Sequence, residues 1–315
     1  MGRIALTRTT CAAVIVAALH AAPARAAPKV WVSGDGVNST TCGVTSPCRT
    51  LQHAHDNVTA GGEIGVIGPG ELGPLTITKA ISIVSDGGGE ASAQTGSATG
   101  IVVNALATDV VQLRGLTIDG TSQVWNGIVF NTGAALHLQL CTIKNFRNGG
   151  AFGIEFQPAN AAKLVVSDSF IINNGTIGGA GIRLAPVAGA TTVVLERTVI
   201  AGNYAGIDAV PLLGAGAITM AVADSTIAAN LTDGILADGS YVPVTVIADR
   251  SRFVNNGVGV HATIFRAVVL LSNSTIAGNG TGLLSDIFGV IGSYGNNNID
   301  KNGTDGAPTM SFAQK

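Results

Sequence analysis

Short apolar runs alternate with turn residues along most of the chain, and this alternation returns at a nearly constant interval. Runs such as TVVLERTVI and AITMAVADSTI are rich in Val, Ile and Thr, alternate in polarity and end at Gly, Asn or Asp, which predicts short strands. Aligned on the isoleucine of the phrase STI, the intervals are 25, 28, 29, 27, 26, 23 and 23 residues. The aligned positions are Ile118, Ile143, Ile171, Ile200, Ile227, Phe253, Ile276 and Ile299.

Two further columns keep the same phase as the isoleucines. An asparagine recurs three residues later, at Asn174, Asn203, Asn230, Asn256, Asn279 and Asn302. A glycine followed by an aliphatic residue comes next, at Gly127, Gly153, Gly181, Gly206, Gly234, Gly259 and Gly282. Three columns in phase over some 180 residues indicate a structural repeat and not a bias of composition.

The repeat predicts an all-β solenoid of about ten coils, in which each strand stacks on its equivalent at about 4.8 Å. No unit contains a helix-length amphipathic stretch, and the units are shorter than the roughly 40 residues of a propeller blade. We expect the column glycines to supply a positive φ at one turn of every coil. We expect the asparagines to form a buried ladder, because an amide both donates and accepts hydrogen bonds.

The two ends of the repeat differ from its middle. Leu51, Ala54 and Val58 share one face of a short predicted helix, which can cover the open end of the apolar core. We therefore expect an N-terminal cap of strand, disulfide loop and helix at 27–60, a parallel β-helix at 61–303 and a C-terminal cap or tail at 304–315.

The phrase [DN]-S-T-I-A-x-N…G-I, seen at Asp224–Ile235 and Asn273–Leu283, resembles right-handed parallel β-helix proteins of the pectin-lyase-like superfamily. The resemblance covers roughly residues 30–310 and implies their fold. Polysaccharide lyases of this superfamily use an arginine as base and acidic side chains, often through calcium, to neutralise a uronate. The short catalytic motifs of pectin methylesterases, polygalacturonases and alginate epimerases are absent from the sequence.

Candidate chemistry lies in one outward-facing column of the predicted solenoid. If the aliphatic residue after each column glycine points inward, Glu155, Arg183 and Asp208 point to solvent on consecutive coils, about 5 Å apart. These three could form the catalytic or binding site of a protein acting on an acidic polysaccharide. They could equally form an exposed ladder of ion pairs that contributes little. Two neighbouring acids would keep Arg183 protonated, which is the wrong state for a base.

Four further residues are candidate substrate contacts. Gln157, Asp238 and His261 occupy outward positions on the same strand face, although Asp238 also fits an Asp-Gly turn. His261 has no carboxylate partner in its own column. Trp125 is either an exposed platform for stacking sugars or part of the core or a lid. Calcium is a candidate cofactor, and no cofactor is certain.

The N-terminus and the cysteines predict an exported protein. Residues 1–26 combine a basic start, an apolar run and an Ala-Arg-Ala site, which is the layout of a signal peptide. Export implies an oxidising environment, so we expect a short disulfide loop between Cys42 and Cys48. Cys141 lies in a strand-like stretch, where a buried, inert thiol is expected.

Composition narrows the function without fixing it. The 315 residues include 43 Gly, only 11% are charged, and the net charge of −2 provides no electrostatic attraction to nucleic acid. No run after the signal peptide approaches the ~20 apolar residues of a membrane span. We expect a monomer that is secreted, periplasmic or on the cell surface. It either binds and possibly cleaves an acidic polysaccharide, as a lyase or glycoside hydrolase, or serves as a structural or adhesive rod.

Overall fold

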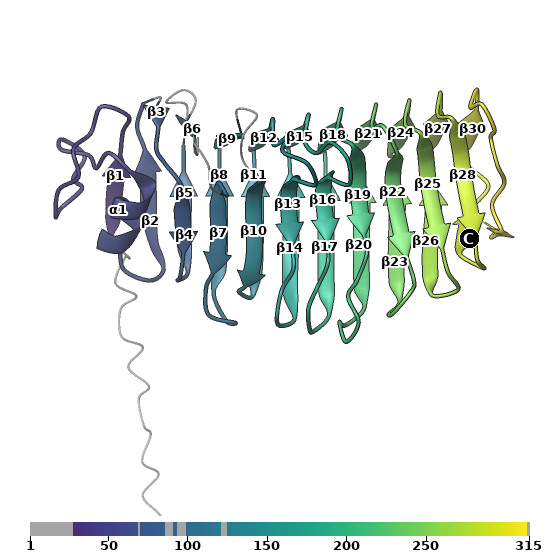
Figure 1. The fold of residues 1–315 in the computed structure, drawn as a ribbon, viewed down its shortest axis with the longest axis horizontal. Helices are drawn as coiled ribbons and strands as arrows, with labels where there is room; N and C mark the ends of the chain where they lie inside the picture. The colour runs from purple at the N-terminus through teal and green to yellow at the C-terminus, as the bar shows by residue number, and fades with distance from the viewer. Residues whose placement is uncertain (1–27, 69, 86–90, 93–98, 121–124, 314–315) are drawn as a thin grey trace, which may run out of the picture.

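The chain winds into a rod whose walls are three parallel β-sheets (Figure 1). The structure, a computed structural model, describes residues 28–68, 70–85, 91–92, 99–120 and 125–313. The expected signal peptide lies outside these residues. A typical coil adds one strand to each sheet, as β21 (Thr226–Ala228), β22 (Asp233–Asp238) and β23 (Val244–Asp249) do. The expected all-β parallel solenoid is confirmed.

The sheets are numbered 1 to 3 and are defined here by their strands. Sheet 1 has 12 described strands: β1 (Lys29–Val32), β2 (Gly62–Val66), β5 (Ile81–Val84), β8 (Val110–Arg114), β11 (Ala135–Gln139), β14 (Ala162–Ser167), β17 (Thr191–Glu196), β20 (Ile218–Ala223), β23, β26 (Ala267–Ser272), β29 (Val290–Ser293) and β31 (Met310–Ser311). Sheet 2 has nine described strands: β4 (Leu75–Ile77), β7 (Ile101–Asn104), β10 (Asn126–Thr132), β13 (Phe152–Phe156), β16 (Ala180–Leu184), β19 (Ala205–Ala209), β22, β25 (Val258–Thr263) and β28 (Thr281–Asp286). Sheet 3 has ten described strands: β3 (Gly70–Glu71), β6 (Ala91–Ser92), β9 (Thr117–Asp119), β12 (Thr142–Lys144), β15 (Phe170–Ile172), β18 (Val199–Ala201), β21, β24 (Arg252–Val254), β27 (Thr275–Ala277) and β30 (Asn298–Asp300).

The asparagine column forms the expected ladder at the corner between sheets 3 and 2. Nδ2 of Asn203 donates to Oδ1 of Asn230 at 3.0 Å, and Nδ2 of Asn230 donates to Oδ1 of Asn256 at 2.9 Å. These amides are 2–3% exposed, so their hydrogen bonds replace water that the fold excludes. The ladder ends at Asp305, whose Oδ1 accepts from Nδ2 of Asn302 at 2.9 Å.

A second ladder, which the sequence reasoning missed, lines the corner between sheets 1 and 3. Here a buried hydroxyl accepts the backbone N–H of the preceding coil, as Oγ of Ser251 does from Ser225 at 3.3 Å. Cys141 occupies the same column, and its N–H donates to Oγ of Ser169 at 3.0 Å. The thiol of Cys141 is free and buried, as expected, and burial raises its pKa.

The expected role of the column glycines is wrong. They are not among the residues with positive φ. A Cβ added to Gly206 would instead lie 2.3 Å from the carbonyl oxygen of Gly234, so glycine is needed where successive coils approach closely. The positive φ at the corner between sheets 1 and 3 belongs to residues directly before the hydroxyl ladder. These are Asp168, Arg197, Asp224, Arg250 and Asn273.

Both ends of the described rod are covered. Helix α1 (Leu51–Asn57) begins after Thr50, whose Oγ1 accepts the N–H of His53 at 3.2 Å. Its apolar face is buried in the core, as expected, and the Cys42–Cys48 disulfide is confirmed. At the other end β31 pairs with β29, and the ring of Phe312 lies 5.4 Å from that of Tyr294. No helix among the described residues is long and apolar enough to cross a membrane.

Candidate functional site

The expected column of polar side chains lies on the outer face of sheet 2. The register pairs Glu155 of β13 with Arg183 of β16, and Arg183 with Asp208 of β19. The isoleucines that precede these residues are fully buried, which turns the three polar side chains outward. We call Glu155, Arg183 and Asp208 the charged row.

The arginine of the charged row is unpaired. Among the described residues no carboxylate forms an ion pair with Arg183, and its buried Nε has no hydrogen-bond partner. Its guanidinium Cζ instead lies 5.0 Å from the centre of the Phe152 ring. The three side chains are half-buried, so the structure does not contain the exposed ladder of ion pairs that was one of the two expectations.

Burial shifts the protonation of both acids in the row. Desolvation raises the pKa of Glu155, although Arg183 and the 2.8 Å hydrogen bond from Nδ2 of Asn126 oppose the shift. Desolvation and the nearby Asp233 raise the pKa of Asp208 to about 7, against the opposing charge of Arg183. A large share of Asp208 is therefore protonated at neutral pH, which lowers the negative charge around Arg183.

His261 has two carboxylate partners that the sequence reasoning missed. Its Nδ1 lies 3.0 Å from Asp233 and its Nε2 lies 3.3 Å from Asp286. Burial alone would lower the pKa of His261, but the two carboxylates raise it above its ordinary value. Neither carboxylate lies in the column of His261, whose neighbours in register are Leu236 and Leu284. Both contacts instead run diagonally between neighbouring coils.

The sequence held a usable signal for the contact with Asp233. The residue directly before a column glycine touches the outward residue of the next coil. Asn126 contacts Glu155 in this way, Phe152 contacts Arg183, and Asp233, which precedes Gly234, contacts His261.

The other expected contacts have separate surroundings. Nε2 of Gln157 donates to Oδ1 of Asn131 at 3.0 Å on the same face. Oδ1 of Asp238 accepts the N–H of Ser240 at 2.7 Å, which makes it part of a local turn. Trp125 is 60% exposed, so it is not a core residue.

A contrasting set of charges lies at the corner between sheets 1 and 3. Nε of Arg197 donates to Asp168 at 2.6 Å, and Arg197 also pairs with Glu196. Nε of Arg250 donates to Asp224 at 2.8 Å, and Arg250 also pairs with Asp249. The arginine hydrogen bonds lower the pKa of both Asp168 and Asp224. Each of the three guanidinium nitrogens of Arg197 and of Arg250 thus donates to a carboxylate.

The charged row is a poor calcium site by itself. Calcium takes 6–8 oxygen ligands, whereas Arg183 lies between Glu155 and Asp208 in the register. Among the described residues, the group with three metal-ligand atoms within 4.8 Å is Cys42, Cys48 and His53, and its two sulfurs are joined in the disulfide.

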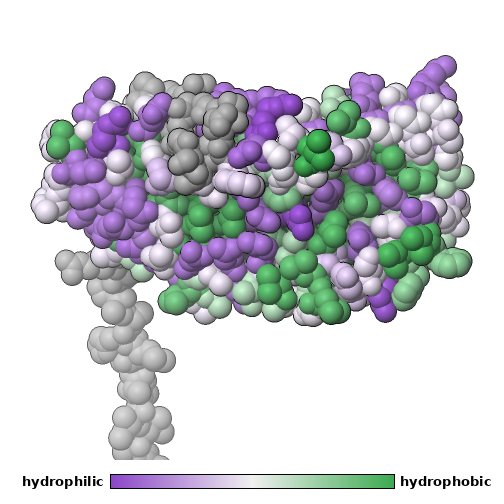
Figure 2. All heavy atoms as spheres, viewed as in Figure 1, coloured by the Kyte–Doolittle hydropathy of each residue, from purple (hydrophilic) through white to green (hydrophobic). Residues whose placement is uncertain are grey.

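Two features border the row on the surface. Towards the N-terminus, its column continues through Val129, Val102 and Thr76 to a hollow of about 550 Å³ beside β4 and β7. Hydrophobic residues gather along the lower edge of the rod in Figure 2, where turns join sheet 2 to sheet 1. Exposed apolar residues of these turns are Leu106, Val187, Leu212, Leu213, Tyr241, Phe265, Ile287 and Phe288.

Stacked parallel coils with an internal asparagine ladder define a parallel β-helix with a pectin-lyase-like fold. Residues 99–276 match the family described as "Right handed beta helix region", and the chain belongs to this family. Its fold is also similar to the crystal structure of pectate lyase Pel9A, at 15% identity and a TM-score of 0.58 over 85% of this chain and 68% of that chain. No curated protein matches the chain.

Proposed function

We propose that this chain is an exported β-helix protein that binds an acidic polysaccharide along the outer face of sheet 2. The unpaired guanidinium of Arg183 carries this proposal. A guanidinium offers a fork of N–H donors that matches a carboxylate, and a half-buried one binds it more strongly than an exposed one. The disulfide and the signal-peptide pattern of residues 1–26 support export.

The neighbours of Arg183 suit a uronate sugar. A carboxyl with a pKa of about 7, such as Asp208, carries a proton part of the time and repels a uronate less than an ordinary aspartate would. Glu155 and Gln157 offer hydrogen-bond acceptors and donors for sugar hydroxyls, and the exposed Trp125 offers a stacking surface. His261 and Asp238 lie further along the same face and extend it.

Cleavage would need a proton-transferring group as well as a binding group. A guanidinium is a fixed positive charge, which suits Arg183 to charge neutralisation better than to proton abstraction. Asp208 is the member of the row whose pKa lies near neutrality, so we assign it any proton transfer that occurs.

The test compares two arginines in a panel of polygalacturonate, alginate and a neutral glucan, with calcium and with a chelator. We expect the unsubstituted chain to bind the acidic polymers, Arg183→Ala to weaken binding at least tenfold (roughly 1.5–3 kcal/mol), and Arg197→Ala to bind normally. Ultraviolet absorbance of unsaturated ends and an assay of reducing ends report lyase and hydrolase activity.

Equal binding by Arg183→Ala and the unsubstituted chain would remove the site. No binding across the panel would favour the structural or adhesive rod. Such a rod needs no ligand, and the ion pairs at the corner between sheets 1 and 3 already join neighbouring coils without one.

A further inference from the structure

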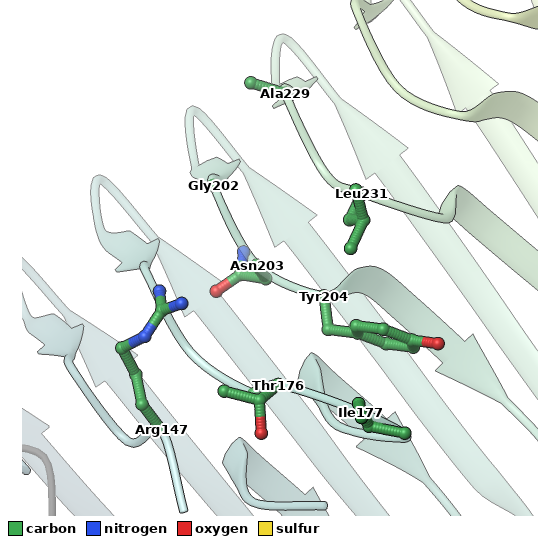
Figure 3. Close-up of a pocket in the computed structure, with 9 residues that line it drawn as sticks. Arg147, Thr176, Ile177, Gly202, Asn203, Tyr204, Ala229 and Leu231 are labelled. Carbon is green, nitrogen blue, oxygen red and sulfur yellow. The ribbon is translucent and has the colours of Figure 1, made fainter. Parts of the chain in front are cut away.

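A second hollow lies at the corner between sheets 3 and 2, apart from the charged row. Its volume is about 310 Å³, which is near the lower end of the range for small-ligand sites. It is formed by the connections β12–β13, β15–β16, β18–β19 and β21–β22, which belong to four consecutive coils (Figure 3). Its lining comprises Arg147, Gly175, Thr176, Ile177, Gly202, Asn203, Tyr204, Ala229 and Leu231. We call it the corner pocket.

Unequal connections between strands create the corner pocket. Residues 173–179 join β15 to β16, whereas only residues 202–204 join β18 to β19, so the longer loop stands above its shorter neighbour. The N–H and Oγ1 of Thr176 donate to the carbonyl of Gly149 at 3.1 and 2.7 Å, which ties the long loop to the preceding coil. The long loop, which forms one wall of the corner pocket, is therefore held in place without a ligand.

One end of the corner pocket carries an uncompensated positive charge. Arg147 is exposed, and its Nη1 donates to Oδ1 of Asn173, which is a neutral partner. Among the described residues no carboxylate pairs with Arg147, unlike Arg197 and Arg250. The remaining N–H groups of this guanidinium are available to an anion.

The other end of the corner pocket is aromatic and apolar. In Figure 3 the ring of Tyr204 lies between Ile177 and Leu231, which are 83% and 71% exposed. The hydroxyl of Tyr204 has no hydrogen-bond partner among the described residues. The pocket thus combines a flat ring, a free hydroxyl and a separate cation.

We propose that the corner pocket binds one acidic sugar residue, with its ring against Tyr204 and its carboxylate at Arg147. The ring of Tyr204 presents the apolar surface that the C–H face of a sugar needs, and its hydroxyl can hydrogen-bond a sugar hydroxyl. Arg147 selects a carboxylate over a neutral substituent through paired N–H donors. This site is independent of Arg183.

Calorimetric titration with D-glucuronate and D-glucose tests the proposal in the Arg183→Ala chain, where the charged row contributes least. We expect glucuronate to bind to this chain. Arg147→Gln should lower the affinity for glucuronate at least tenfold, to the level of the affinity for glucose. Tyr204→Ala should abolish the binding of both sugars. Tyr204→Phe keeps the ring and should retain glucuronate binding, which separates loss of stacking from misfolding.

Tyr241→Ala and Arg252→Gln are the matched controls, since both residues are exposed on other turns and strands. Both controls should bind glucuronate as the Arg183→Ala parent does. Absence of glucuronate binding in the parent would overturn the proposal. So would binding that survives both Arg147→Gln and Tyr204→Ala.

Discussion

Arginines occur in two regions of this rod that share the same stacking but differ in their partners. At the corner between sheets 1 and 3, Arg197 and Arg250 are exposed, and each pairs with two carboxylates. On the face of sheet 2, Arg183 is half-buried beside two acids in register, yet it pairs with neither.

The difference shows that register alone does not make an ion pair. At the corner, Arg197 and Arg250 each reach an aspartate at the equivalent position of the preceding coil and the acid directly before them in the sequence. On sheet 2, the ring of Phe152 holds the guanidinium of Arg183, and burial weakens the charge of Asp208. The arginines at the corner therefore have carboxylate partners within the chain, whereas the guanidinium of Arg183 has N–H donors that a ligand can use.

The largest expected effect on stability and binding comes from a substitution that separates the stacked coils beneath the charged row. Gly206→Ala places a Cβ 2.3 Å from the carbonyl oxygen of Gly234, so β19 must move away from β22. We expect the free energy of unfolding to fall by about 3 kcal/mol and polyuronide binding to be lost. Denaturant titration measures the change. Gly43→Ala is the control, because a Cβ there meets no atom within 4 Å, and an equal loss in both variants would contradict the account.

Two aspartates should give opposite pH dependences of stability. The pKa of Asp208 rises from 3.8 to about 7 on folding, so the folded chain holds more protons and loses stability as the pH rises between these values. Asp208→Asn should remove this loss and gain on the order of 2 kcal/mol over that range. The pKa of Asp168 is lowered, so its stabilising contribution is present above 3.8 and is lost as the pH falls.

Thermal unfolding across this pH range compares Asp208→Asn with Asp168→Asn. Relative to the unsubstituted chain, Asp208→Asn should gain stability as the pH rises from 3.8 to about 7. When the series is extended below pH 3.8, Asp168→Asn should lose relative stability as the pH rises towards 3.8 and then show a constant difference. A common sign for the two variants would contradict the assigned surroundings.

The smallest effect separates stability from binding. Arg250→Ala should lower the melting temperature slightly, and less so in high salt, because exposed ion pairs are weak and screened. Arg183→Ala should leave the melting temperature nearly unchanged while it removes polyuronide binding. A larger thermal loss in Arg183→Ala than in Arg250→Ala would indicate that Arg183 serves the fold.

Much of the architecture could be predicted because it repeats. The phase of the isoleucine and asparagine columns predicted the stack and the buried amides. The column of glycine followed by an aliphatic residue predicted the register of Glu155, Arg183 and Asp208. The hydroxyl ladder was equally periodic, but its column mixes Ser and Thr with Cys141, so its identity as a column was less visible.

Features that depend on the path of the backbone could not be predicted. The phase of a glycine does not show whether it supplies a positive φ or a close approach, as Gly206 illustrates. The diagonal contact between His261 and Asp286 depends on the local offset of two strands. The corner pocket over Tyr204 depends on how the long loop folds over the short one.

The central claim is that the guanidinium of Arg183 is available to a ligand, whereas those of Arg197 and Arg250 are occupied. Nitrogen–proton NMR of the arginine Nε–H groups, recorded during titration with trigalacturonate, tests this directly. The account predicts that the Arg183 signal shifts and exchanges more slowly with water while the Arg197 and Arg250 signals stay in place. An unmoved Arg183 signal, or equal shifts at all three arginines, would contradict it.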